Sequence, residues 1–315
     1  MSKFLGKGDM ISKVTILLST YNGSEFLQEQ LDSLYKQTYS NITILVRDDG
    51  SIDSTVSILE TEQQKGHLSL LQKNINLGPA LSFFELLKYA ALTDTEYIAF
   101  CDQDDVWLPE KVERAIAGLS KFKNNTPAMY CTKVELVDES LNHLYFSDSP
   151  KKIGFGNSLV ENIATGCTVV LNRKAINLLC KNLPSEPQMH DWWCYIVISC
   201  FGVVVFDPTP TIKYRQHNNN TIGVATNSIT RLYRKFCRFF GAKRQRHWCS
   251  EQAAILLSVY SNEAMSTTNE LITDKIIVAK SSLSCRLSLV FSQEIWRQKW
   301  SDNLILRILI LINRI

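Results

Sequence analysis

The first hundred residues of the chain alternate between apolar strands and amphipathic helices. Buried-strand patterns occur at 14–19, 42–48, 68–72 and 96–100, and apolar residues at helical spacing occur between them, at 24–38, 53–64 and 80–92. Ser24 and Asp53 are the predicted caps of the first two helices. Strands separated by helices of this length pair in parallel through right-handed crossovers. The sequence therefore predicts an α/β fold with a mainly parallel central sheet flanked by helices.

A polar cluster follows each of these four strands. The clusters are STYN at 19–22, RDDGS at 47–51, NINLGP at 74–79 and DQDD at 102–105. Parallel sheets bind ligands at the carboxyl ends of their strands. The four clusters are therefore predicted to face one ligand site.

The DQDD cluster places three carboxylates, Asp102, Asp104 and Asp105, within four positions. Carboxylates this close repel one another unless a positive group shares the site. Mg²⁺ and Mn²⁺ are bound by one or two carboxylates together with phosphate oxygens and water. The cluster therefore favours a site for Mg²⁺ or Mn²⁺, and a solvated turn that ends in a helix cap is the alternative.

The sequence contains neither a GxxxxGK[ST] motif nor a GxGxxG motif, so a glycine-rich cradle for phosphate is not expected. A diphosphate bridged by the metal is the ligand that fits better. Tyr21 offers a stacking face for a base, and Asp49 could accept a hydrogen bond from a base edge. The DDGS sequence around Asp49 is equally typical of a simple turn.

Two later segments add candidate catalytic and binding groups. MHDWW, at 189–193, places Asp191 beside two tryptophans at a predicted helix start. Partial burial raises the pKa of a carboxylate and makes it a better general base, although Asp191 could also be a helix cap. YRQHNNN, at 214–220, supplies Arg215 as a candidate contact for the ligand and His217 as a candidate metal or phosphate ligand. The alternative for His217 is an ordinary hydrogen-bonded side chain.

These motifs together amount to a family resemblance that covers roughly residues 13–223. The segment from VTILLSTYN to DDGSIDST resembles the opening of the inverting glycosyltransferase family 2, whose members have the GT-A fold. FCDQDDVW resembles the DxD metal motif of that family, and HDWW occupies the place of its acidic catalytic base. YRQHNNNTIG is similar to the form found in rhamnosyltransferases that build bacterial O-antigen and related polysaccharides.

The resemblance implies roles for individual residues at the nucleotide. Ser19, Tyr21 and Asp49 are expected to contact the nucleotide, as STYN and DDGS line the nucleotide pocket in the family. Asp102 and Asp104 are expected to hold ribose and metal, and Asp104 is the principal metal ligand.

The resemblance also implies the reaction. Asp191 is expected to deprotonate an acceptor hydroxyl while that oxygen attacks the anomeric carbon of the donor, so the configuration inverts in one displacement. The metal neutralises charge on the leaving phosphates. This sequence has His190 where many members carry an acidic residue before the base.

The expected function is thus a metal-dependent, inverting transfer of a sugar from a nucleotide sugar to a saccharide acceptor. dTDP-rhamnose is the favoured donor, and a lipid-linked acceptor in bacterial surface polysaccharide synthesis is the favoured context. One alternative is a nucleotidyltransferase, which would need a basic residue near a triphosphate, and the loop after the first strand has none. Another alternative is a non-catalytic nucleotide-sugar-binding subunit of a polysaccharide assembly complex.

The last third of the chain has a different character. We expect an N-terminal extension at 1–12, a GT-A domain at 13–225 and a basic, amphipathic helical region at 226–315. Residues 229–248 contain seven Arg or Lys residues and no acid. This pattern favours attachment to anionic lipid, and a helix face packed on the catalytic domain is the alternative. The net charge of the whole chain is only +3, so nucleic acid is not an expected partner.

Cysteine usage and the termini predict a location. The nine cysteines occur singly, without a CxxC pair, and are expected to be reduced. The N-terminal segment is too polar for a signal peptide, and no run of about 18 apolar residues occurs. We therefore expect a cytoplasmic protein, peripheral on the inner face of the bacterial plasma membrane.

Overall fold

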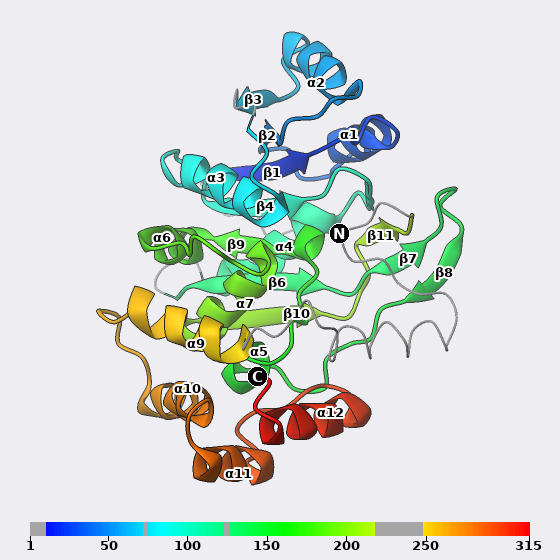
Figure 1. The fold of residues 1–315 in the computed structure, drawn as a ribbon. Helices are drawn as coiled ribbons and strands as arrows, with labels where there is room; N and C mark the ends of the chain where they lie inside the picture. The colour runs from blue at the N-terminus through cyan, green and yellow to red at the C-terminus, as the bar shows by residue number, and fades with distance from the viewer. Residues whose placement is uncertain (1–10, 72–74, 123–125, 218–247) are drawn as a thin grey trace, which may run out of the picture.

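The computed structural model describes residues 11–71, 75–122, 126–217 and 248–315 of the chain (Figure 1). Within these ranges, seven strands form the main sheet. Their spatial order is β10 (Val203–Asp207), β6 (Ala128–Thr132), β9 (Val170–Asn172), β4 (Tyr97–Cys101), β1 (Val14–Thr20), β2 (Ile42–Asp48) and β3 (Ser69–Leu71). β9 runs antiparallel to β4 and β6, and the other neighbours pair in parallel. The predicted mainly parallel sheet is confirmed.

The two faces of the sheet are covered by different helices. Along β1, Leu17 belongs to the core on one face, and Ile16 and Leu18 belong to the core on the other. This alternation follows from the two-residue period of a strand. The first core is covered by α3 (Pro79–Ala91), α6 (Arg173–Lys181) and α7 (His190–Phe201), and the second by α1 (Leu27–Tyr35), α2 (Thr55–Gln64) and α4 (Lys111–Leu119).

A smaller sheet lies beside the carboxyl ends of the central strands (Figure 1). Its strands, in spatial order, are β5 (Val106–Trp107), β11 (Ile212–Arg215), β7 (Glu135–Val137) and β8 (His143–Phe146). β5 follows the DQDD cluster directly, and β11 ends two residues before His217. This sheet therefore joins the two segments that were predicted to bind metal.

The C-terminal helices α9 (Trp248–Val259), α10 (Thr267–Ala279), α11 (Leu283–Phe291) and α12 (Trp300–Leu311) pack below the main sheet, next to α7 and the short α5 (Phe155–Ser158) (Figure 1). Their buried side chains, including Leu256, Ile276 and Leu306, belong to the same core as Trp193 and Ile196 of α7. Burial in a shared core stabilises the packing of these helices against α7. The expectation of C-terminal helices is confirmed for 248–315, whereas most of the basic stretch at 229–248 lies outside the described residues.

The two predicted helix caps are wrong. α1 begins at Leu27, after Phe26, and Ser24 makes no cap. Asp53 instead ties two segments together, because its carboxylate accepts hydrogen bonds from the backbone N–H groups of Ser24, at 3.1 Å, and Thr55, at 3.0 Å. In the described parts of the chain, no helix is long and apolar enough to cross a membrane.

Candidate active site

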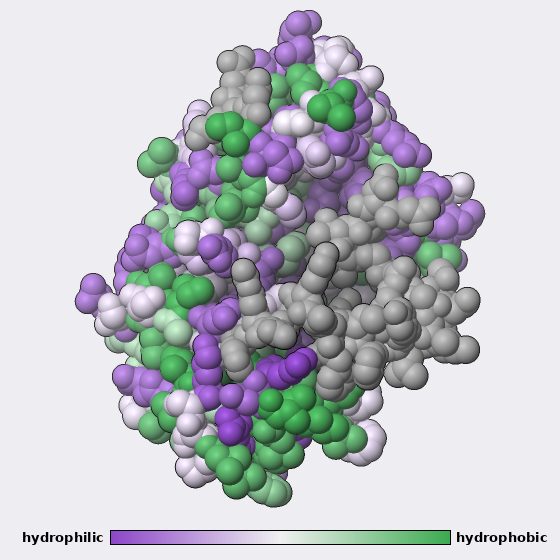
Figure 2. Space-filling view, in the orientation of Figure 1, coloured by the Kyte–Doolittle hydropathy of each residue, from purple (hydrophilic) through white to green (hydrophobic). Residues whose placement is uncertain are grey.

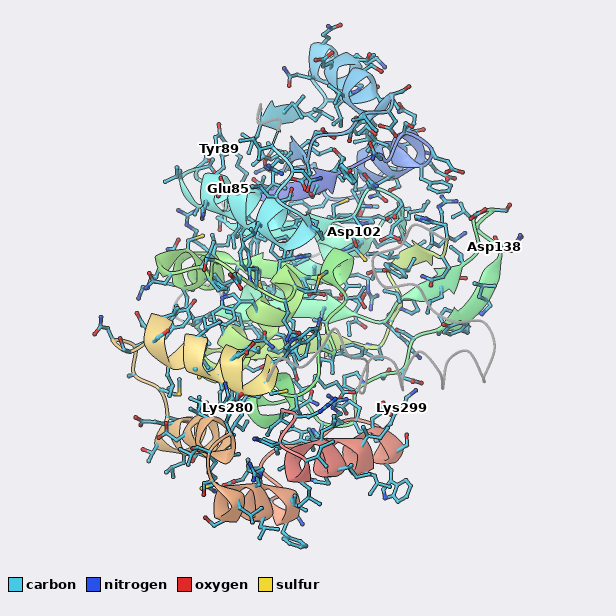
Figure 3. All side chains as sticks on the ribbon, viewed as in Figure 1. Glu85, Tyr89, Asp102, Asp138, Lys280 and Lys299 are labelled. Carbon is cyan, nitrogen blue, oxygen red and sulfur yellow. The ribbon has the colours of Figure 1, made fainter. Side chains whose placement is uncertain are left out.

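The loops after β1, β2 and β4 and the described part of the third cluster, residues 75–79, meet at one edge of the main sheet. Asp102 lies at this edge (Figure 3). The loops after β1, β2 and β4 lie side by side because these three strands are adjacent and parallel. Three further segments border this edge: the 3₁₀ turn at Gly166–Thr168, the start of α7 and the end of β11. The site is therefore built from segments that span residues 19–217.

Asp49 joins the loop after β2 to the start of α3. Its carboxylate, 3% exposed, pairs with the fully buried guanidinium of Arg47. It also accepts the backbone N–H groups of Leu77 and Gly78, each at 2.8 Å. Gly78 has a φ of 78°, which a residue with a side chain rarely adopts, so the glycine permits this turn. A contact between Asp49 and a base would require one of these protein donors to be released.

Ser19 and Ser82 continue this network from β1 to α3. Their hydroxyl oxygens lie 2.6 Å apart, and Arg47 donates to the Ser82 oxygen at 2.9 Å. The Ser19 hydroxyl is therefore oriented before any ligand binds.

Tyr21 presents a ring that is 49% exposed, as a stacking face requires. Its backbone is clamped by the side-chain amide of Gln103, which accepts from the Tyr21 N–H at 2.8 Å and donates to the Tyr21 carbonyl at 3.0 Å. A Cβ on Gly23 would lie 2.1 Å from the Gln103 Oε1 atom, so only glycine leaves room for the clamp. Gln103 and Gly23 were not identified from the sequence as functional, although the interruption of the aspartates by a glutamine was a usable signal.

The three aspartates of DQDD occupy different environments. Asp102 and Asp104 are partly exposed, whereas Asp105 is fully buried. Burial, followed by repulsion from Asp104 and Asp191, raises the pKa of Asp102 to about 7. Burial also raises the pKa of Asp105 well above its usual range, with a further contribution from Asp104. The repulsion expected from the sequence is therefore present.

Asp105 is the fully buried residue of this loop. One of its carboxyl oxygens accepts the backbone N–H of Arg215 at 3.1 Å, and the Cys167 thiol lies beside it. Lys111 is also fully buried, its ammonium 4.1 Å from the centre of the Trp107 ring, and burial lowers its pKa to about 8. Asp105 thus lies on the buried side of the loop that carries the partly exposed Asp102 and Asp104.

Arg215 is buried and fastens the DQDD loop to two other segments. Its Nε donates to the Asp104 carbonyl at 2.9 Å, and its guanidinium pairs with Glu29 of α1 and donates to the Glu139 carbonyl. The guanidinium also lies 4.4 Å from the centre of the Phe26 ring. The protein itself thus holds the guanidinium in place through contacts on several sides.

His217 lies beside the predicted metal ligand. Its Nε2 atom is 2.8 Å from a carboxylate oxygen of Asp104, and both side chains are partly accessible to solvent. Two carboxylates and an imidazole suit Mn²⁺, and the carboxylates alone suit Mg²⁺. Asp102, Asp105 and Cys167 also bring ligand atoms within 4.8 Å of one another. Burial raises the pKa of Asp102, Asp105 and the Cys167 thiol alike. Because Asp105 and Cys167 are fully buried and Asp102 and Asp104 are partly exposed, the latter pair is more accessible to a cation.

Asp191 lies in the first turn of α7 with its carboxylate only 5% exposed. Burial raises its pKa to about 6, against hydrogen bonds from the Trp192 N–H, the Asn162 side chain and the Gly166 backbone that lower it. Asp191 contributes to the raised pKa of Asp102, so the two carboxyl groups are close enough to repel each other. A carboxylate with a pKa near 6 is well suited to accept a proton at neutral pH.

His190 is buried next to Asp191 in α7. Its ring packs against Phe83, with centroids 4.0 Å apart, and edge-on against Phe100. Neither ring nitrogen has a hydrogen-bond partner among the described residues, and burial lowers the pKa of the ring to about 3. Where the family usually carries an acid, this chain therefore places a neutral group.

The sequence profile of Glycosyl transferase family 2 matches residues 15–178, which is more than half of the chain. The chain belongs to glycosyl transferase family 2. The family resemblance is thereby confirmed over a range that includes STYN, DDGS and DQDD and ends before HDWW, and the chain is a glycosyltransferase. This membership argues against the nucleotidyltransferase alternative.

Relatives match over most of this glycosyltransferase. It is 27% identical to the dTDP-rhamnosyl transferase RfbG of Shigella flexneri over 94% of this chain and 99% of the relative. It is 34% identical to the Escherichia coli enzyme UDP-Glc:alpha-D-GlcNAc-diphosphoundecaprenol beta-1,3-glucosyltransferase WfgD, over 52% of this chain and 62% of the relative.

Two solved structures share the fold. TarS of S. aureus, residues 1–349, superposes with a TM-score of 0.57 and 17% identity, over 96% of this chain and 80% of the other. The mannosyltransferase PcManGT of Pyrobaculum calidifontis, in complex with GDP-Man and Mn²⁺, superposes with a TM-score of 0.53 and 14% identity, over 96% and 85%. The expected GT-A fold is confirmed.

Proposed function

We propose that this glycosyltransferase moves rhamnose from dTDP-rhamnose to a saccharide acceptor, with inversion and with the help of Mg²⁺ or Mn²⁺. The observation that carries the chemistry is the meeting of Asp191, with its pKa of about 6, and the Asp102–Asp104 pair at one sheet edge. Similarity to a dTDP-rhamnosyl transferase over nearly the whole chain supports the choice of donor.

Asp191 acts as the general base. Its carboxylate is held by the Trp192 N–H and the Asn162 side chain, so it is oriented before the acceptor arrives. It accepts the proton of the acceptor hydroxyl as the oxygen attacks the anomeric carbon and the bond to the nucleoside diphosphate breaks. The proton ends on the Asp191 carboxyl, and the electron pair of the broken bond ends on the diphosphate.

Asp104 and Asp102, with His217, are the residues that would hold the divalent ion. When bound, the ion supplies positive charge that stabilises the leaving diphosphate. Asp102 also lies where it can accept a hydrogen bond from ribose, as the family resemblance implies. Arg215 and Asp105 keep the loop that carries these ligands in place.

Ser19, Tyr21 and Asp49 form the nucleotide side of the site in this proposal. The exposed Tyr21 ring stacks on the base, and the Ser19 hydroxyl offers a hydrogen bond at its edge. The Asp49 carboxylate accepts a hydrogen bond from the base in exchange for one of its protein donors. Arg215 is a further candidate contact through an exchange of its partner Glu29.

A lipid-linked acceptor and attachment to the inner membrane surface complete the proposal. The name of WfgD states that its acceptor is a sugar linked to diphosphoundecaprenol.

Apolar side chains gather over α11 and α12 (Figure 2), and Lys280 and Lys299 lie at the borders of these two helices (Figure 3). The exposed apolar residues of these two helices are Leu283, Leu287, Phe291, Trp300, Leu304, Ile308 and Leu311. An apolar face bordered by cations suits the surface of an anionic bilayer.

Calorimetry tests the nucleotide and the metal together. We expect dTDP to bind the full chain in Mn²⁺ more tightly than UDP or GDP. We expect EDTA or Asp104→Ala to weaken binding at least about tenfold, a loss of about 1.4 kcal/mol. Asp191→Asn is the matched control, because it removes a nearby carboxylate that does not hold the diphosphate. Equal binding of UDP would contradict the choice of donor, and no binding of any diphosphate to folded protein would contradict the mechanism.

A further inference from the structure

Two side-chain hydrogen bonds join the short helix α5 to α7, the helix that carries Asp191. The Tyr195 hydroxyl donates to the Asn157 side-chain oxygen at 2.8 Å. The Trp192 indole N–H donates to the Ser158 carbonyl at 2.7 Å. Tyr195 follows Asp191 by four positions, so the two side chains lie on the same side of α7, one turn apart. Contacts with α5 therefore hold the part of α7 that carries Asp191.

Asn157 is fully buried, and its side chain uses both of its N–H groups. The amide nitrogen donates to the Glu161 carboxylate at 3.0 Å and to the Trp296 carbonyl at 2.9 Å. A carboxylate and a carbonyl only accept hydrogen bonds, so the amide nitrogen has to face them and the amide oxygen is left for the Tyr195 hydroxyl. The partners of Asn157 thus fix the orientation of its side chain.

The segment 292–299, which joins α11 to α12, packs directly on α5. A Cβ on Gly156 would lie 1.7 Å from the Glu294 carbonyl oxygen, so only glycine allows this approach. The Arg307 side chain of α12 donates to the Ile295 carbonyl at 2.8 Å, and Ile295 itself is fully buried. The segment is therefore held by α5 on one side and by α12 on the other.

Glu161 connects Asn157 to the far end of the same segment. Its Oε2 atom accepts the backbone N–H of Gln298 at 2.7 Å and also accepts from the Asn157 amide. Asn157 thus contacts the segment twice, directly at Trp296 and through Glu161 at Gln298. It joins this C-terminal segment to the hydroxyl of Tyr195 in α7.

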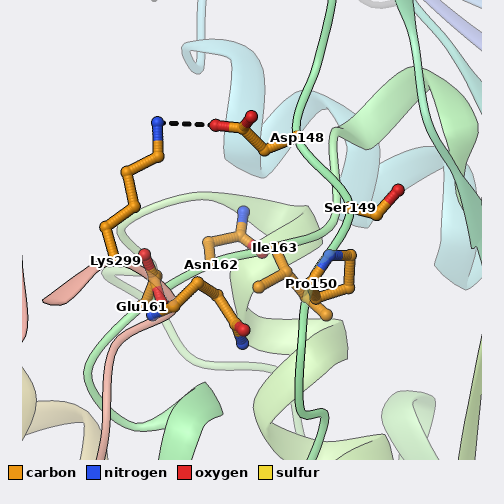
Figure 4. A pocket seen from close by; sticks show the side chains of 8 residues that line it. Asp148, Ser149, Pro150, Glu161, Asn162, Ile163 and Lys299 are labelled. Atoms are coloured by element: carbon orange, nitrogen blue, oxygen red, sulfur yellow. Dashed lines mark hydrogen bonds and ion pairs between the residues drawn. The ribbon is translucent and has the colours of Figure 1, made fainter.

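Glu161 and its neighbour Asn162 also border a polar cavity of about 180 Å³ (Figure 4). The lining comes from residues 148–150, 161–163 and 298–299. Lys299 and Asp148 form an ion pair at 2.5 Å between two of these segments (Figure 4). This ion pair holds the C-terminal segment independently of Glu161, so a change at Glu161 leaves the segment attached.

We propose that Asn157 is a positioning residue for sugar transfer, and that it fixes the Asp191 end of α7 relative to the segment 292–299. The proposal rests on the proposed function, in which Asp191 is the base. It adds that the C-terminal helices help to place this base, in addition to their proposed contact with the membrane.

Tyr195→Phe breaks the bond to Asn157 and keeps the buried ring. We expect kcat for transfer to fall about tenfold, because a misplacement of about 1 Å costs about 10²-fold and this change is smaller. Calorimetry should show a Kd for dTDP in Mn²⁺ within about twofold of the original, since the residues assigned to the nucleotide are not part of this bond.

Tyr130→Phe is the matched control. It removes the hydroxyl that donates to Asp207 at 2.8 Å from a similarly buried tyrosine in the core on the other face of the sheet. Labelled dTDP-rhamnose, UDP-glucose and UDP-GlcNAc serve as donors, and washed membranes of the source organism with the gene deleted supply the acceptor. The control should keep kcat within about twofold of the original chain, because it leaves α7 in place.

The same change in an Asp191→Asn chain shows whether Tyr195 acts through the base. Without a carboxylate at position 191, its placement no longer limits the rate, so Tyr195→Phe should lower the residual transfer less than about twofold. A second tenfold fall would show that Tyr195 acts elsewhere, which overturns the proposal. A merely structural effect is distinguished in this way, because partial unfolding removes the same fraction of the rate from both chains.

Glu161→Ala and Glu161→Gln test the link to the C-terminal segment. Alanine removes the acceptor that Asn157 and Gln298 share, and kcat should fall about three- to fivefold, the size of one hydrogen bond. Glutamine keeps an acceptor oxygen and should restore kcat to within about twofold of the original. Equal rates for the two variants would contradict this link.

Two further results would count against the positioning role: an unchanged kcat in Tyr195→Phe, or an equal fall in Tyr130→Phe. Failure of the proposed function gives different results. An unchanged kcat in Asp191→Asn would show that Asp191 is not the base. Absence of both transfer and dTDP binding in the unaltered chain would contradict the proposed reaction itself.

Discussion

Asp49 and Asp191 are two carboxylates in one site that are buried to the same degree and stabilised very differently. Asp49 has a guanidinium and two backbone N–H groups as partners. Asp191 has hydrogen bonds but no cation paired with it among the described residues, and burial raises its pKa to about 6. In the proposed mechanism, the donor side thus contains a carboxylate neutralised by the protein, whereas the acceptor side contains a destabilised carboxylate that can take a proton.

The largest expected effect comes from removing that group. Asp191→Asn keeps the shape and one acceptor oxygen but cannot accept the proton, so kcat for transfer should fall by about 10²–10⁴-fold. Transfer assays with membranes measure this fall, and dTDP binding should persist. A loss below about threefold would show that another group is the base.

Asp49→Ala is expected to cost the most stability. It leaves the Arg47 charge buried and unpaired, which lowers the free energy of unfolding by about 3–5 kcal/mol. The control is Asp94→Ala, which breaks an exposed pair with Lys13 and should leave the stability nearly unchanged, because solvent screens that pair. Urea unfolding of both variants measures the difference, and equal costs would show that burial of the Arg47 pair is unimportant.

The pH dependence of kcat/KM and that of stability test two different properties of Asp191, its role as a base and its effect on the free energy of unfolding. Transfer, as kcat/KM, should fall about tenfold per pH unit below pH 6, where Asp191 is protonated. Because the folded pKa lies above the ordinary value of 3.8, the carboxyl costs no stability below about pH 4 and its cost grows as the pH rises to about 6.

Asp191→Asn should therefore stabilise the fold at pH 8 by up to about 3 kcal/mol, at 1.36 kcal/mol per pKa unit, and hardly at all at pH 4. Unfolding of both proteins at the two pH values provides the measurement. If Asp191→Asn were less stable than the original chain at pH 8, the ionised Asp191 carboxylate would not be destabilising the fold.

The smallest expected effect concerns the clamp on Tyr21. Gln103→Ala removes both hydrogen bonds, and Gly23→Ala displaces the same amide, so each should weaken dTDP binding a few-fold, about 0.5–1.5 kcal/mol. Because both changes break one interaction, the double variant should be no weaker than either single variant. Additive losses in calorimetry would show that the two residues act independently.

The alternation of strands and helices could be predicted from the sequence because the spacing of apolar residues within each short segment indicates its secondary structure. β1, β2, β4 and α3 lie close to the predicted ranges, and the polar clusters meet where parallel pairing requires. β9 was not predicted as a separate antiparallel strand, because three buried residues carry no period. Its direction is set by its neighbours β4 and β6.

The roles of individual site residues were harder to predict where they depend on distant partners. Asp102, Asp104, His217 and Asp191 are brought together as predicted. Arg215 was predicted to be a candidate contact for the ligand. No residue near it in the sequence indicates that it pairs with Glu29, 186 positions away. The cavity beside Asn162 was missed altogether, since its walls come from three segments without a motif.

Gln298 also ties the segment at 152–161 to the order in which the chain is made. It bonds to Glu161 and Lys152 across 137 and 146 positions, so these contacts can form only after the residues between them have been synthesised. Every strand of the main sheet and Asp191 itself leave the ribosome before Gln298, because synthesis runs from the N-terminus. A nascent chain can therefore assemble its main sheet before the 152–161 segment acquires its contacts with the residues that precede α12.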